Sequence, residues 1–204
     1  MSDKLTAIIL AGGRSSRFGS NKANATLGGK TLLERAVRAC REVADEVLIV
    51  LAPEQPEPEL PSVERFKVVR DRESFEGPLS GLLTGLEAAD SQWCVACTCD
   101  APAAQPAVLE LLAGRREEGI LAVLPEVEGR ALPFPSIVST AALETLRRDF
   151  AGGQRRVRLA LEALPHVTVS ERDLRTVDPS LVSFRNVNTP DDLERLSRDL
   201  GLGI

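Results

Sequence analysis

The residues best suited to chemistry lie in a loop near the N-terminus that is rich in glycine and basic residues. The loop reads Leu10-Ala11-Gly12-Gly13-Arg14-Ser15-Ser16-Arg17-Phe18-Gly19 and is followed by Asn21 and Lys22. A glycine pair lets backbone N–H groups approach an anion closely, while Arg17 and Lys22 can bring positive charge to a polyphosphate. The loop therefore predicts a phosphate-binding site. The alternative is a tight turn between a strand and a helix, with solvated basic side chains.

Two well-known phosphate-binding loops do not fit this sequence. Gly29-Lys30-Thr31 matches the end of a Walker A motif, but the position five residues before Gly29 is Asn24 rather than glycine. The dinucleotide-binding pattern G-x-G-x-x-G fails because Gly12 is followed by Gly13 and Arg14. These mismatches remove the main support for a kinase-like or an NAD-binding protein.

Two acidic residues directly follow predicted strands. Asp100 comes after the apolar run at 93–99, and Asp71 comes after the predicted strand at 66–70. In an α/β sheet, ligands bind at the carboxyl ends of the strands. Mg2+ takes oxygen ligands and is commonly held by one or two carboxylates together with substrate phosphates. Asp100 is therefore a candidate metal ligand and Asp71 a candidate ligand-binding residue, although a loop acid that caps the next helix explains either position.

The chain has a single histidine, His166. A Ser-His-Asp triad or a Cys-His pair would depend on this residue alone, and a histidine-rich metal site is excluded. Cys94, Cys97 and Cys99 alternate along a predicted strand, which places Cys94 on the face opposite to the other two. We expect buried thiols there rather than a metal site. Catalysis must then use carboxylates, Lys, Arg and backbone amides, with or without a metal ion.

Composition and charge limit the partners of this protein. Its 204 residues include 25 Lys and Arg against 30 Asp and Glu, a formal charge of -5, so no overall positive field attracts nucleic acid. No apolar run approaches the roughly 20 residues of a membrane span, and residues 1–10 do not resemble a signal peptide. We expect a cytoplasmic protein without nucleic acid or membrane as partner, folded as a single domain over residues 1–204.

The elements that would position these residues alternate along the chain. Apolar runs predict strands at 6–10, 46–51, 66–70, 93–99, 120–124 and 167–169. Helical spacing predicts helices from residue 31 to about 40, at 79–89, 108–114, 141–150 and 155–164, and after residue 190. This alternation predicts an α/β protein with a three-layer α/β/α, doubly wound fold around a mostly parallel sheet, and a ligand at the carboxyl ends of its strands.

Six segments together resemble the molybdenum cofactor guanylyltransferase family, whose members are nucleotidyltransferases with a GT-A-like, nucleotide-diphospho-sugar transferase-like fold. These segments are residues 10–22, 69–71, 77–81, 99–102, 153–157 and 186–193. The first loop alone indicates only the nucleotidyltransferase superfamily. The match narrows to the family because Arg155-Arg156-Val157 and Asn186-Val187-Asn188-Thr189-Pro190 occur in the same chain.

This resemblance implies transfer of GMP from GTP to the terminal phosphate of the molybdopterin cofactor, with release of pyrophosphate and with Mg2+ as cofactor. It implies that Lys22, Arg17 and Asp100 are catalytic and that Asp100 holds the metal. It implies nucleotide binding by Leu10, Ala11, Gly12, Gly13, Lys22, Asp71, Ser80 and Asp100. The acceptor would be bound by Arg155, Arg156, Asn186 and Asn188. Transient contact with a molybdoenzyme or with other cofactor-biosynthesis proteins is also implied.

Several alternatives stay open. Many family members have Asn after the second strand, whereas this chain reads Val50-Leu51-Ala52-Pro53, so this position does not indicate guanine preference. A cytidylyltransferase on the same cofactor, another sugar-phosphate nucleotidyltransferase and a noncatalytic cofactor-delivery protein are the other candidates. For Arg155 and Arg156, a solvated helix face is the alternative to acceptor binding.

An attacking phosphate is already an anion and needs no general base, so a chain with one histidine is compatible with the transfer reaction.

Overall fold

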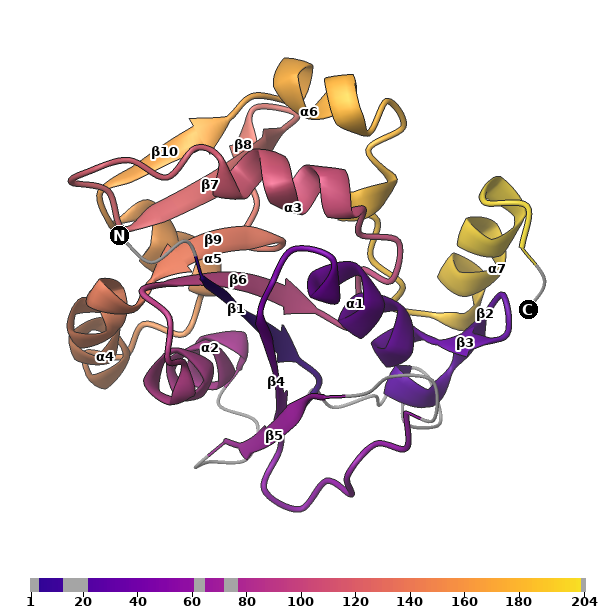
Figure 1. Ribbon diagram of the computed structural model, residues 1–204, viewed down its shortest axis with the longest axis horizontal. Coiled ribbons are helices and arrows are strands. Elements are labelled where there is room, and N and C mark those ends of the chain that lie inside the picture. The colour runs from indigo at the N-terminus through magenta and orange to yellow at the C-terminus, as the bar shows by residue number, and fades with distance from the viewer. Residues whose placement is uncertain (1–3, 13–21, 61–64, 72–76, 203–204) are drawn as a thin grey trace.

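The protein is described by a computed structural model that covers residues 4–12, 22–60, 65–71 and 77–202. An eight-stranded sheet lies at its centre, in the order β10-β7-β9-β6-β1-β4-β5, with β8 paired to β7 (Figure 1). Its strands are β1 (Leu5–Leu10), β4 (Glu46–Leu51), β5 (Lys67–Arg70), β6 (Trp93–Thr98), β7 (Ala122–Val127), β8 (Arg130–Ala131), β9 (Ser136–Ser139) and β10 (His166–Val169). Strands β5, β4, β1 and β6 are parallel, and β10 is parallel to β7. The expected mostly parallel sheet is confirmed.

Helices cover both faces of this sheet. Helices α1 (Leu32–Arg41), α3 (Pro106–Ala113) and α6 (Glu171–Val177) contribute side chains to one core, and α2 (Pro78–Ala88), α4 (Leu143–Ala151) and α5 (Val157–Glu162) to a second. Strand β1 serves both cores, because successive side chains of a strand point to opposite faces. Its Ala7 and Ile9 lie in the first core and its Ile8 in the second. The expected three-layer arrangement is confirmed.

The order of the strands determines which segments meet. Strand β1 pairs with β4 on one side and with β6 on the other, so that Leu10 lies opposite both Val50 and Thr98. These three parallel strands end at the same edge of the sheet. The segments that follow Leu10, Leu51 and Thr98 therefore lie together at this edge, where α/β proteins bind ligands.

The alternation of strands and helices breaks down after β7. Strands β8 and β9 follow without an intervening helix, and β9 lies between β6 and β7 and runs antiparallel to both. Pro133 and Pro135 exclude a regular helix before β9, since proline lacks a backbone donor and clashes with the preceding turn. The expectation of alternation throughout is wrong here because a four-residue strand is too short for its periodicity to stand out.

Further short elements lie outside the sequence-based expectation. The 3-10 helix η1 (Lys22–Asn24) leads into a hairpin of β2 (Thr26–Leu27) and β3 (Lys30–Thr31), and α6 was likewise not expected. Helix α7 (Pro190–Asp199) lies beside this hairpin (Figure 1), and Leu27, Val187 and Leu193 share a third, small core. Within the described ranges, no helix combines the length and the apolar character that a membrane span requires.

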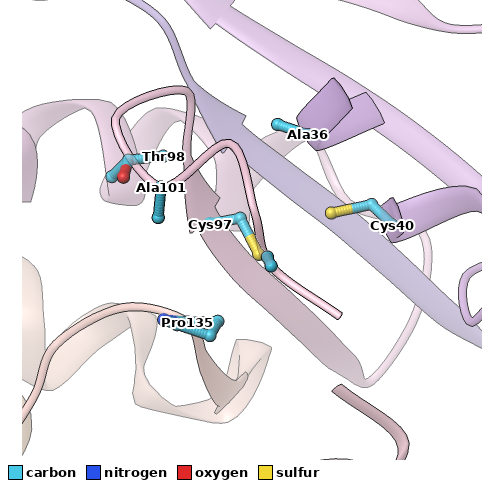
Figure 2. Close-up of a pocket in the computed structure, with 7 residues that line it drawn as sticks. Ala36, Cys40, Cys97, Thr98, Ala101 and Pro135 are labelled. Atoms are coloured by element: carbon cyan, nitrogen blue, oxygen red, sulfur yellow. The ribbon is translucent and has the colours of Figure 1, made fainter. Parts of the chain in front are cut away.

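All four cysteines are free and buried. Cys94 lies in the core that includes α2, whereas Cys97 and Cys99 lie in the core that includes α1, as the strand alternation predicted. Figure 2 shows Cys97 of β6 and Cys40 of α1 beside the same small pocket. The hydrogen bond with Cys40 and complete burial raise the pKa of Cys97 well above its usual value, and burial raises the pKa of Cys99 to about 12. Both thiols therefore lie in the apolar core of the sheet, where cysteine packs as a small hydrophobic side chain.

Candidate active site

Three polar side chains from distant parts of the sequence meet at the edge where β6 ends. Lys22 Nζ lies 2.9 Å from Asp100 Oδ1 and donates a hydrogen bond of 3.0 Å to Asn188 Oδ1. The Lys22 side chain is only 10% exposed, whereas that of Asp100 is 42% exposed. The arrangement combines a sheltered, fixed ammonium group with a carboxylate that solvent and ligands can reach. Such a pair suits the binding of a phosphate group or of a cation that accompanies it.

The backbone around these side chains explains how they are brought together. Asp100 follows β6, and its carbonyl accepts a hydrogen bond of 2.8 Å from the Val187 N–H group. This bond places the segment before α7 against the end of β6. Asn188 comes next in that segment, and its N–H group donates to Asp192 Oδ2 at 3.0 Å. Asp192 belongs to the capping box at the start of α7, so the helix start holds Asn188 in place.

A second polar cluster lies where β5 ends. The Asp71 N–H group donates to the Leu51 carbonyl at 2.8 Å, which places Asp71 beside the end of β4. Asp71 Oδ1 accepts hydrogen bonds from Ser80 Oγ at 2.7 Å and from Thr84 Oγ1 at 3.1 Å. Both hydroxyl groups belong to α2. The structure thus brings the predicted residues Asp71 and Ser80 together, and Thr84 joins them one turn further along the helix.

The end of β1 contacts the loop after β4 closely. The Ala11 N–H group donates to the Val50 carbonyl at 2.9 Å. A Cβ atom at Gly12 would lie 2.7 Å from the Ala52 backbone nitrogen, so only glycine fits there. Gln55 Nε2 donates to the Ala11 carbonyl at 3.0 Å, and Gln55 Oε1 accepts from the Ala52 N–H group at 3.4 Å. The start of the glycine-rich loop is therefore held by a side chain as well as by the sheet.

Comparisons of the chain with known proteins identify its family. The model of the MobA-like NTP transferase domain matches residues 7–168. A probable molybdenum cofactor guanylyltransferase of Chloroflexus aggregans is 36% identical over 97% of this chain and 95% of its own length. The molybdenum cofactor guanylyltransferase of Desulfosudis oleivorans is 34% identical over 98% of each chain.

The chain belongs to the molybdenum cofactor guanylyltransferase family.

Solved structures agree with this assignment. The molybdopterin-guanine dinucleotide biosynthesis protein A of Archaeoglobus fulgidus superposes with a TM-score of 0.81 at 28% identity, covering 96% of this chain and 98% of its own. A 2-C-methyl-D-erythritol 4-phosphate cytidylyltransferase of Thermus thermophilus reaches a TM-score of 0.71 at 21% identity, over 98% of this chain and all of its own, and shares the fold. The nucleotidyltransferase-like fold expected from the sequence is thereby confirmed.

The residues expected to bind the acceptor in this family member occupy two places. Asn186 and Asn188 are exposed, and the Val187 between them is buried. Asn188 joins the Lys22 cluster directly. Arg155 and Arg156 are exposed and precede α5. The Arg155 carbonyl lies 3.7 Å from the Cβ position of Gly77, so this turn lies against the start of α2 rather than against Asn188.

Arg155 has contacts of its own that the sequence did not reveal. Its guanidinium carbon lies 3.9 Å from the centre of the Phe150 ring, and its Nη1 donates to the Phe150 carbonyl at 2.6 Å. The side chain therefore packs against the C-terminal end of α4. Arg156 shares the same turn, where its N–H group donates to Gln154 Oε1 at 2.9 Å. Two further predicted residues of the family motif, Gly13 and Arg17, lie outside the described residues.

The sequence analysis missed three contributors to this site, namely Gln55, Thr84 and Arg70. Arg70 Nη1 donates to the carbonyls of Pro53 and Gln55 at 3.1 and 2.7 Å, which orders the proline-rich loop. One signal was present, because Gln55 is the only amide side chain among the prolines and acids of that loop. Its target, a carbonyl of the backbone 44 positions away, is not readable from spacing.

Proposed function

We propose that this family member transfers GMP from GTP to the terminal phosphate of molybdopterin and releases pyrophosphate. The observation that carries the proposal is the Lys22–Asp100 pair, 2.9 Å apart at the carboxyl end of β6 and beside the end of β1. The names of the relatives support the same reaction. The protein would act in the cytoplasm and pass its product to a molybdoenzyme or to another cofactor-biosynthesis protein through transient contact.

In the proposed reaction, an oxygen of the acceptor phosphate forms a bond to the α-phosphorus of GTP. The bond between the α-phosphorus and the bridging oxygen breaks, and pyrophosphate leaves with that oxygen. The attacking group is an anion, so the chain need not remove a proton. The residues of the chain instead position the two phosphates and stabilise the negative charge on them.

Each described residue has a part in this scheme. The sheltered Lys22 ammonium group, held by Asp100 and Asn188, would stabilise charge on the triphosphate. The backbone of Leu10, Ala11 and Gly12 would bind the nucleotide, together with Asp71 and Ser80 at the start of α2. Asn186, Asn188, Arg155 and Arg156 would bind the acceptor. Outside the described residues, Gly13 would bind the nucleotide and Arg17 would be catalytic.

The donor set fits a magnesium ion. The described residues contain no group of three or more His, Cys, Asp or Glu side chains that could enclose a metal, but Asp100 offers one accessible carboxylate. Mg2+ is commonly held in this way, by one or two carboxylates, substrate phosphates and water. We therefore propose that Asp100 holds Mg2+ together with the triphosphate. Bound there, the ion neutralises part of the charge on the phosphates.

A nucleotide panel tests the proposal. The protein is incubated with molybdopterin, Mg2+ and each of GTP, CTP, ATP and UTP, and pyrophosphate release is measured. We expect release with GTP. Release with CTP alone would make the protein a cytidylyltransferase, and release with none of the four would refute the transfer reaction.

The variant Asp100→Ala separates an enzyme from a cofactor-delivery protein. Turnover is expected to fall by about 100-fold or more if Asp100 holds the Mg2+ ion and the Lys22 ammonium group that would stabilise the negative charge on the phosphates. Delivery of preformed cofactor would survive the change. Asp90→Ala is the matched control, because Asp90 is an exposed acid that precedes β6, whereas Asp100 follows it. This control is expected to keep full turnover.

A further inference from the structure

A cavity of about 360 Å3 lies between α1, the β2–β3 hairpin and the segment that leads into α3. Lys30, Arg35 and Arg38 line it, and its described lining includes no acidic residue. Small-molecule sites begin at about 300 Å3, so the cavity is large enough for a compact ligand. We propose that it binds a small organic phosphate, at a site separate from the active site.

Arg35 provides the strongest indication of an anionic ligand. Its side chain is half-buried, with Nε donating to the Pro102 carbonyl at 3.1 Å and Nη1 to the Leu27 carbonyl at 3.3 Å. Both acceptors are neutral, and among the described residues no carboxylate forms an ion pair with Arg35. Partial burial makes the charge of a guanidinium group less favourable, and an anion beside it would offset that cost. Burial lowers the pKa of Arg35, consistent with surroundings that lack that partner.

The other two basic side chains add positive charge to the same cavity. Lys30 lies on β3 and has no ion pair with a carboxylate in the described part of the chain. Arg38 lies one helical turn after Arg35, and its Nε contacts Glu34 Oε1 at 3.2 Å. Glu34 compensates the charge of Arg38. Among the described residues, no carboxylate pairs with Lys30 or Arg35, so a ligand can compensate these two charges. A guanidinium group beside an ammonium group suits the geometry and charge of a phosphate.

The rest of the wall is apolar and indicates that the ligand has an organic part. Pro102, Ala103, Pro106, Val182 and Leu200 all line the cavity. Such a surface gives little to inorganic phosphate, but it can pack against a sugar, base or other carbon skeleton. The described lining does not include Lys22, Asp100 or Asn188, so the cavity shares none of these three residues with the active site, although its Pro102 lies two positions after Asp100.

Calorimetry with AMP and with inorganic phosphate tests the proposal. Both probes are titrated into Lys22→Ala protein, in which the phosphate affinity of the active site is reduced. We expect AMP to bind more tightly than inorganic phosphate, because only AMP can use the apolar wall. Adding Lys30→Glu is expected to weaken AMP binding by about tenfold or more, since a charge-assisted contact becomes repulsive. Arg35→Lys keeps the charge, removes the guanidinium fork, and is also expected to weaken binding.

The matched control is Arg172→Glu, the same reversal of charge at an exposed position on α6. When Arg172→Glu is added to Lys22→Ala protein, the affinity for AMP is expected to stay within about twofold of that of Lys22→Ala alone, because exposed surface charges act weakly at a distance. The proposal is wrong if Lys22→Ala protein does not bind AMP, or if it binds inorganic phosphate as tightly as AMP. It is also wrong if adding Lys30→Glu to Lys22→Ala protein leaves the affinity for AMP unchanged. Because Lys30 has no described ion pair to lose, the Lys30→Glu result does not depend on how Arg35→Lys folds.

Discussion

Asn188 Oδ1 accepts a hydrogen bond of 3.0 Å from Lys22 Nζ, although 166 positions separate the two residues in the chain. The same ammonium group contacts Asp100, and the Asn188 N–H group is held by Asp192. Family resemblance alone assigns Asn188 to the acceptor. Its contact with Lys22 indicates that it also positions the ammonium group.

Asn188→Ala is expected to lower kcat by about tenfold or more, because the Lys22 ammonium group loses one of its two described acceptors. Steady-state kinetics with GTP and molybdopterin measure the effect, and Asn188→Gln, which can restore the amide acceptor, is the rescue variant. Asn186→Ala is the control, since Asn186 is exposed and is expected to change mainly the KM of the acceptor. A change in acceptor KM alone for Asn188→Ala would contradict a positioning role.

Gln55→Ala is expected to raise the KM for the nucleotide by about three- to tenfold while changing kcat less, because the backbone at Ala11 loses a side-chain hydrogen bond that holds it. The variant leaves the Gln55 carbonyl, and hence its bond to Arg70, in place. Nucleotide titration at saturating acceptor measures the shift. Glu54→Ala is the control, because Glu54 is the adjacent exposed residue, and this variant is expected to bind the nucleotide normally. An unchanged KM in Gln55→Ala would show that the sheet alone positions the Ala11 backbone.

Ser80→Ala is expected to lower the free energy of unfolding by about 1–2 kcal/mol, because Asp71 loses the closer of its two hydroxyl donors at a buried position. The double variant with Thr84→Val is expected to cost more, since it removes both donors. Urea unfolding followed by circular dichroism measures the difference. Thr168→Val, a change at an exposed threonine on β10, is the comparison, and equal losses in both proteins would contradict a special role for the Asp71 cluster.

Asp192 makes the start of α7 sensitive to acid. The hydrogen bond from the Asn188 N–H group, followed by those of Thr189, lowers the pKa of the Asp192 carboxyl group below its usual value. A carboxyl group whose pKa is lowered by folding stabilises the folded state above its unfolded pKa, and this contribution disappears as the pH falls through the folded pKa. Asp192→Ala is therefore expected to lower Tm at pH 7 and to match the parent protein near pH 2. Thermal scans between pH 7 and pH 2 measure how the difference in Tm between the two proteins changes. A difference in Tm that does not depend on pH would exclude the Asp192 carboxylate as its source.

The amino-acid sequence by itself determined the strands at the centre of the sheet. Glu46–Leu51 forms a strand with the predicted bounds, and Cys94 and Cys97 lie in opposite cores as alternation requires. These features are local, because an apolar run long enough to be buried on both faces and the two-residue period of a strand are visible within a few positions. The same local patterns placed Asp100 at a strand end and Lys22 directly after the glycine-rich loop.

The tertiary structure alone decided which of these residues meet. Strand β9 enters the sheet between β6 and β7 through pairing partners far away in the chain, and no local pattern specifies a four-residue strand. The Gln55 bond to Ala11 and the Asn188 bond to Lys22 likewise join segments that only the packed sheet and the start of α7 bring together. Local residue patterns determine where a chain can form strands and helices, whereas contacts between distant side chains depend on the packing of the whole molecule.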